Sequence, residues 1–107
     1  RLYHSLLSEM SADRKVTVVH IPPIYQVDAE KREQLARLFP GQAIDVSRLP
    51  ALLRHAVDGL PNVRLVDPSE VFLREQGRSP LYFPFDGHLN PRGHALLARV
   101  IAENLEL

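Results

Sequence analysis

The chain has 107 residues, of which 45% are apolar and 24% charged, and its thirteen basic residues balance its thirteen acidic ones. A neutral chain with singly scattered arginines lacks the basic patch of a nucleic-acid-binding protein, and no apolar run approaches the ~18 residues of a membrane-spanning helix. The absence of cysteine excludes disulfides, thiolate catalysis and cysteine-ligated zinc, and it is compatible with the periplasm and the cytoplasm alike.

Residues 1 to about 12 are predicted to form an amphipathic helix, because apolar residues recur there at helical spacing: Leu2, Tyr3, Leu6, Leu7 and Met10. The following run, Val16 to Ile21, is β-branched and apolar without alternation. Such a run is typical of a strand buried on both faces of a parallel sheet. Pro22-Pro23 ends the strand, and His20 is expected to be a core histidine bonded to the backbone.

Two helices are predicted from their caps in the middle of the chain. Asp28 can cap a helix that ends near Leu38, and Ser47 can cap a helix that Gly59 and Pro61 terminate. The second of these helices has a continuous apolar face, which indicates packing on a core.

A second strand, Val63 to Val66, is followed by a helix with Asp67 as its N-cap that continues to about Glu75. Leu81 to Phe83 is predicted to be a short strand or extended segment, and Asn90 caps the last helix. The alternation of helices and strands predicts an α/β fold with parallel strands, and residues 1–107 are expected to form a single domain.

The stretch FPFDGHLNPRGHALL contains an acid and a histidine two positions apart, Asp86 and His88, in a loop before a capped helix. A carboxylate can accept the Nδ1 proton of a histidine, fix its tautomer and leave Nε2 free to take a proton from a hydroxyl nucleophile. We expect the loop to be held rigid by its aromatic and proline residues, Phe83, Pro84 and Phe85. Asp86 and His88 are therefore candidates for the acid and base of a catalytic triad.

The segment DGHLNPRGHALLARVI resembles the last conserved block of the SGNH (GDSL-type) serine hydrolases and their acetyltransferase relatives. VTVVHIPPIYQV and VRLVDPSEVF resemble, more weakly, a late strand and the next strand of that fold. The resemblance implies a three-layer α/β/α fold, His88 as general base and Asp86 as its orienting acid. It also implies that His94 is a structural histidine, which we expect to be buried in the last helix, and that Gly93 permits close helix packing. It further implies that no metal or organic cofactor is required and that the substrate is a small-molecule or carbohydrate ester.

The nucleophilic serine of that family lies in a Gly-Asp-Ser block, with oxyanion donors after it, and this sequence contains none of these blocks. Its serines fall in predicted helices, caps and turns rather than on a strand-to-helix elbow. The chain begins at Arg1, and a two-face-buried strand needs more neighbours than this sequence supplies. We therefore expect the C-terminal part of a larger hydrolase domain, which needs its N-terminal half and is inactive alone.

Two alternatives remain open. Asp86, His88 and His94 are three residues of types that bind zinc, although His88 and His94 are six positions apart rather than four. Alternatively, the chain is a non-catalytic hydrolase-like module that uses an apolar helix face to bind a partner, with Leu49, Leu52, Leu53 and Ala56 on that face.

Overall fold

The structure is a computed structural model that describes residues 2–105, and within them it contains six helices and a two-stranded parallel sheet. This mixed helix and strand content confirms the α/β class. The chain forms two compact units. The sheet unit combines the residues up to His20 with Ser47–Asp67, and the helical unit combines Ile21–Val46 with the residues from Pro68 onward.

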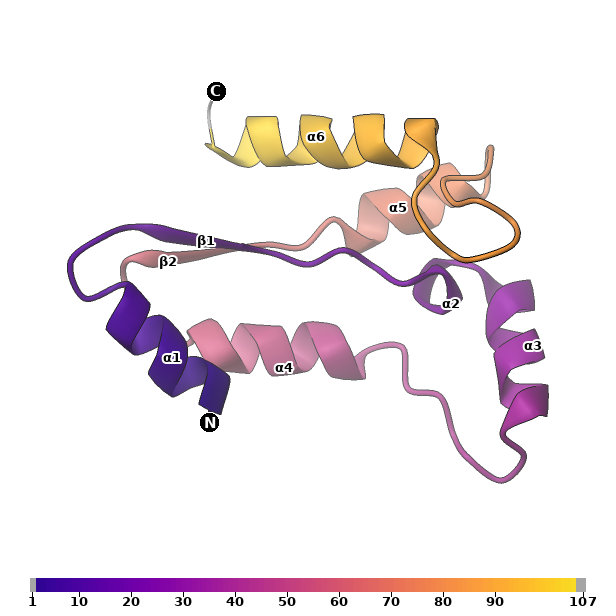
Figure 1. Cartoon of the computed structure of the whole chain (residues 1–107), viewed down its shortest axis with the longest axis horizontal. Helices are drawn as coiled ribbons and strands as arrows, with labels where there is room; N and C mark the ends of the chain where they lie inside the picture. The colour runs from indigo at the N-terminus through magenta and orange to yellow at the C-terminus, as the bar shows by residue number, and fades with distance from the viewer. Residues whose placement is uncertain (1, 106–107) are drawn as a thin grey trace. The chain divides into compact units, whose positions relative to one another are not determined.

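The sheet unit contains α1 (Leu2–Met10), β1 (Val16–Val19), α4 (Arg48–Val57) and β2 (Val63–Val66). The two strands run parallel, with Val16 opposite Val63, and α1 and α4 lie near each other (Figure 1). A parallel pair needs a long crossover connection, and here the crossover includes α4. The predicted first helix, both strands and the α4 helix are thus confirmed in type and place.

β1 is shorter and less buried than its sequence predicts. It ends at Val19, and its valines are only half buried while Thr17 is exposed. Within residues 2–105 the sheet has two strands, β1 and β2, and it leaves the side chains of β1 half buried or exposed. The prediction of a strand buried on both faces is therefore wrong there. His20 is buried, and its backbone N–H donates to the Val66 carbonyl oxygen at 2.9 Å, as expected of a core histidine.

The helical unit contains α2 (Ile24–Val27), α3 (Ala29–Leu38), α5 (Ser69–Gln76) and α6 (Pro91–Leu105). α2 was not predicted, because a single turn directly after Pro22-Pro23 has no periodicity to reveal it. The three longer helices, α3, α5 and α6, are confirmed. No helix within residues 2–105 is long and apolar enough to cross a membrane.

Two of the predicted N-caps form as expected. The Asp28 carboxylate accepts the Lys31 backbone N–H at 3.1 Å, and the Asn90 side-chain oxygen accepts the Gly93 backbone N–H at 2.9 Å. Each bond satisfies a backbone donor that the first turn of a helix leaves open. These caps fix where α3 and α6 begin.

Two other predicted caps differ. Ser47 occupies the N-cap position of α4, but its backbone is already helical and its side chain makes no capping bond. At α5 the N-cap is Pro68 rather than Asp67, and Pro68 makes no side-chain capping bond. A capping side chain bonds to N2 or N3 from an extended backbone, which a helical Ser47 cannot supply.

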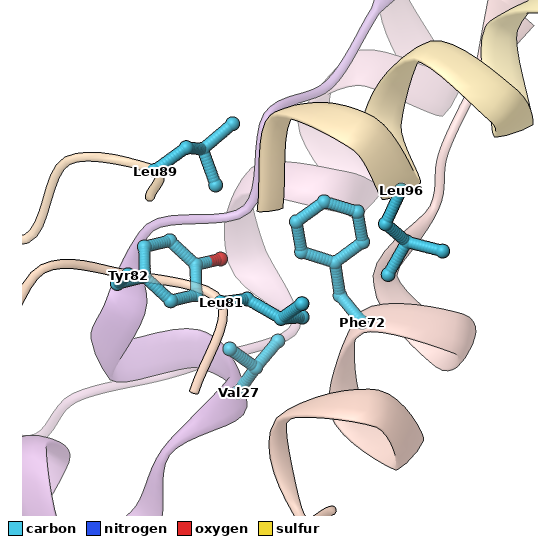
Figure 2. Packing of buried hydrophobic residues seen from close by; sticks show 6 residues of the cluster. All are labelled: Val27, Phe72, Leu81, Tyr82, Leu89 and Leu96. Carbon is cyan, nitrogen blue, oxygen red and sulfur yellow. The ribbon is translucent and has the colours of Figure 1, made fainter. Parts of the chain in front are cut away.

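The core of the helical unit is one cluster of buried apolar side chains from α2, α5, α6 and the segment between α5 and α6 (Figure 2). Phe72 of α5 is completely buried, and its ring meets that of Tyr82 edge-on, with 6.4 Å between centroids. The Tyr82 hydroxyl donates to the Pro22 carbonyl oxygen at 2.5 Å, and burial raises the pKa of this tyrosine. The other members of the cluster are Val27, Leu81, Leu89 and Leu96.

α6 packs through Gly93 and Leu96, which are buried, while His94 is exposed. The prediction that His94 is a buried structural residue is therefore wrong. Adjacent positions on a helix point about 100° apart, so burial of Gly93 turns His94 toward solvent. The expected close packing at Gly93 is confirmed, since its backbone lies against that of Leu81.

Candidate functional site

Asp86 and His88 lie on a loop whose two ends are joined by hydrogen bonds. Tyr82 and Leu89 form an isolated antiparallel bridge, and the Phe83 backbone N–H donates to the His88 carbonyl oxygen at 2.8 Å. The predicted extended segment thus exists only as this bridge, and it does not join the β1–β2 sheet. The result is a closed loop, residues 83–88, with fixed ends.

A glutamine side chain connects the base of the loop to α3. The Gln76 side-chain oxygen accepts the Leu81 backbone N–H at 2.8 Å, and its amide nitrogen donates to the Asp28 carboxylate at 3.0 Å. Asp28 also caps α3, so one carboxylate supports both the helix start and the loop. Asn90 adds a bond to the Pro80 carbonyl oxygen at 3.0 Å. These bonds give the loop a rigid support of the kind a functional site needs.

Two contacts join Asp86 to His88. One carboxylate oxygen accepts the His88 backbone N–H at 3.0 Å, and the other lies 3.2 Å from His88 Nδ1. Gly87 makes this possible with a φ of 74°, a left-handed conformation that most residues avoid. An aspartate that bonds a backbone N–H two residues on closes a tight turn. The same turn presents Nδ1 to the carboxylate and leaves Nε2 pointing away from it.

The hydrogen bond from the His88 backbone N–H lowers the pKa of Asp86, and the bond from the His88 side chain lowers it further. A charged carboxylate is a better hydrogen-bond acceptor than a protonated one, which explains the direction. Asp86 is therefore ionised at neutral pH. It can hold the imidazole in the tautomer with a proton on Nδ1 and stabilise the imidazolium once formed.

The pair is open to solvent: the side chains of His88 and Asp86 are 81% and 57% exposed. Phe85 is 96% exposed and Phe83 is also exposed, so the expectation that these rings hold the loop is wrong. The backbone bonds and Gln76 hold it instead. Exposure of both the pair and an adjacent phenyl ring identifies this loop as a surface that a ligand or a further part of the protein can reach.

The structure does not gather the alternative metal site. His94 is an exposed residue near the start of α6. Asp86 and His88 instead contact each other across Gly87. Over residues 2–105 no group of three histidine, cysteine, aspartate or glutamate side chains is placed to hold a metal ion.

The serines in the described segment include two with structural roles. The buried Ser11 hydroxyl donates to the Ser8 carbonyl oxygen at 3.4 Å, and Ser69 accepts a 2.6 Å bond from the Gln26 amide. The Ser11 bond is local to the end of α1, and the Ser69 bond joins α2 to α5. They are consistent with the expectation that the serines of this chain serve in helices and turns.

A groove of about 300 Å³ begins beside Asp86 and continues along α3. Lys31 and Gln34 supply polar atoms, and the Lys31 ammonium lies 3.5 Å from the Pro84 carbonyl oxygen. The rest of its wall is largely apolar: Ile24, Tyr25, Leu35, Leu38, Pro84 and Phe85. We name it the α3 groove. Sequence reasoning missed it, although residues 31, 34, 35 and 38 form a stripe at helical spacing.

Comparison with protein-family models, curated proteins and solved structures gives no match to this chain.

Proposed function

We propose that this chain is the C-terminal part of an SGNH-type serine hydrolase domain that cleaves, or transfers, an acyl group of an ester. The observation that carries the proposal is the contact of 3.2 Å between His88 Nδ1 and the ionised Asp86 carboxylate. Together with the resemblance of the surrounding segment, this contact supplies two of the three members of a catalytic triad.

In the proposed reaction a serine from the N-terminal half of the domain would lie at His88 Nε2. Nε2 takes the hydroxyl proton while the serine oxygen bonds to the ester carbonyl carbon, and Asp86 stabilises the imidazolium. The imidazolium then returns the proton to the leaving alkoxide, giving an acyl-enzyme. Water, activated by the same nitrogen, releases the acid; an alcohol acceptor in its place makes the enzyme a transferase. No metal or organic cofactor takes part.

The proposed parent fold is a three-layer α/β/α sandwich with a parallel sheet. Support comes from the sheet unit, where the valines of β1 are half buried and each strand of the pair has one edge unpaired within residues 2–105. Apolar residues of α1 are exposed as well: Leu2, Tyr3, Leu6 and Met10. Added strands and helices would bury this surface, as large α/β sheets do.

The test is fluorophosphonate labelling of three proteins: the intact protein that contains this chain, its His88→Ala variant, and the isolated chain. Labelling of the intact protein alone supports a reactive serine activated by His88. A folded intact protein that is not labelled contradicts the proposal, because an activated serine reacts with this probe irrespective of substrate.

A second candidate is a non-catalytic hydrolase-like module. It is favoured by the bond from the His88 backbone N–H to Asp86, which closes a turn and needs no catalytic purpose. On this alternative, His88→Ala leaves partner binding and any labelling of the intact protein unchanged.

A further inference from the structure

We propose that Asp28 and Gln76 are positioning residues of the loop that carries His88. Asp28 orients the Gln76 side-chain amide, and the oxygen of that amide holds the backbone at the base of the loop. The inference rests on the proposed hydrolase function and assigns two further residues to it. Both residues act through the backbone of the loop rather than on the substrate.

The base of the loop lacks one of the backbone bonds that an antiparallel pair normally makes. The loop is closed by a bridge between Tyr82 and Leu89. Next to that bridge the Asn90 backbone N–H donates to the Leu81 carbonyl oxygen at 2.9 Å. In a regular antiparallel pair Leu81 would donate its own N–H back to Asn90. The Asn90 carbonyl oxygen instead accepts the His94 backbone N–H at 2.9 Å, because α6 begins there.

Gln76 supplies the acceptor that the start of α6 withdraws. Its side-chain oxygen accepts the Leu81 backbone N–H at 2.8 Å. Leu81 is completely buried, so water cannot replace this bond, and an N–H left without an acceptor would be unfavourable. Gln76 is the last residue of α5. The bond therefore fixes the base of the loop to the end of that helix.

Asp28 determines which end of the Gln76 amide faces the loop. A carboxylate accepts hydrogen bonds but donates none, whereas an amide donates through nitrogen and accepts through oxygen. One Asp28 oxygen accepts the Gln76 amide N–H at 3.0 Å, and the other accepts the Lys31 backbone N–H at 3.1 Å. The Gln76 nitrogen thus faces Asp28, and its oxygen is left to face Leu81. Through these bonds the start of α3 holds the loop in place.

The experiment exchanges the carboxylate and the amide between the two positions. Gln76→Glu keeps an acceptor for Leu81, but it places a second negative charge against Asp28. Asp28→Asn leaves a single oxygen, which cannot accept from both Lys31 and Gln76 in the directions that the two carboxylate oxygens now serve. The double variant restores the link, because the introduced amide can cap α3 with its oxygen and donate to the introduced carboxylate.

The measurement is kcat and KM of the intact protein for a soluble ester. Each single variant should lower kcat about tenfold to a hundredfold and change KM less than about twofold, since a displaced base impairs the reaction rather than substrate binding. The double variant should return kcat to within about threefold of wild type. Gln26→Ala is the matched control. It removes a 2.6 Å bond to Ser69 that joins α2 to α5 without contacting the loop, and it should keep the wild-type kcat.

Single variants with the wild-type kcat, or a double variant no more active than the single ones, overturn the inference and leave the hydrolase function standing. If the single variants do not fold, the double variant decides: a folded double variant with wild-type kcat supports the inference, and an unfolded one overturns it. If the folded intact protein shows no hydrolysis that depends on His88, the hydrolase function fails, and hydrogen exchange of the Leu81 amide decides. Exchange that is faster in the single variants than in the double variant supports the link, and equal exchange overturns it.

Discussion

The backbone of Gly93 lies so close to Leu81 that a Cβ atom on Gly93 would be 2.1 Å from the Leu81 carbonyl oxygen. That oxygen already accepts the Asn90 backbone N–H at 2.9 Å, so it cannot move without breaking a bond at the start of α6. The contact places α6 directly on the segment that leads into the loop of Asp86 and His88. Gly93 thereby determines the distance between the helix and the candidate site.

Gly93→Ala is expected to destabilise the protein by about 1–3 kcal/mol, because overpacking outweighs the gain in helix propensity. Urea unfolding followed by circular dichroism measures this. Gly77→Ala serves as the control, since its Cβ would meet the nearest atom at 3.3 Å and its φ is negative. Equal stabilities of the two variants would show that the close contact is absent in solution.

His88→Ala in the intact protein is expected to lower kcat for ester hydrolysis by about 10³-fold or more, and Asp86→Asn somewhat less. The larger loss follows because His88 carries the proton while Asp86 only orients it. Steady-state kinetics on a soluble ester checks both. Near-wild-type rates in both variants would remove the pair from catalysis.

The pKa of Asp86 is expected to lie below its ordinary value of 3.8 in the folded protein. The carboxylate contacts are therefore present above that pH and are lost as the pH falls through the lowered pKa. Because the backbone bond is the largest cause, His88→Ala should raise this pKa only part of the way back. NMR titration of the Asp86 carboxyl carbon measures both, and full return to 3.8 in the variant would contradict the ranking.

Gly87 has a φ of 74°, so Gly87→Val is expected to strain the loop by about 1–2 kcal/mol and to separate the Asp86 and His88 side chains. Gly87→Asn is the matched comparison, because asparagine tolerates this conformation. The readout is the lowered Asp86 pKa, which Gly87→Asn should keep and Gly87→Val should lose. Identical Asp86 pKa values in the two variants would mean that the turn does not need a left-handed residue.

Tyr82→Phe is expected to destabilise the protein by about 1–3 kcal/mol, because it leaves the Pro22 carbonyl oxygen without its buried donor. Tyr3→Phe, on the exposed helix α1, should change stability by less than about 0.5 kcal/mol. Since burial raises the Tyr82 pKa, wild-type stability should also fall as pH rises above about 10. Denaturant unfolding from pH 8 to 11 tests whether the Phe variant lacks that fall.

The parts of the fold that the sequence predicts correctly depend on neighbours a few residues away. Asp28 and Asn90 each bond a backbone N–H three positions on, so their caps are readable from the chain alone. The strand pair is predicted from its β-branched composition, and the Asp86–His88 contact from its two-residue spacing. Such features need no knowledge of the tertiary structure.

The remaining features depend on contacts between distant segments. The exposure of His94 follows from which side of α6 meets Leu81, and periodicity leaves more than one side possible. The bonds of Gln76 to Asp28 and Leu81 join segments that no local pattern connects. The exposure of Phe85 is equally non-local, since aromatic residues in a loop are buried only if another element covers them.

The parallel pairing of Val16 with Val63 also has a consequence for biosynthesis. At about 5–20 residues per second, β1 emerges from the ribosome several seconds before its partner strand exists. During that interval an apolar, β-branched segment has an unpaired backbone and is open to association with other nascent chains. Delayed pairing in the sheet unit should therefore make the yield of the folded protein depend on chaperones and on growth temperature.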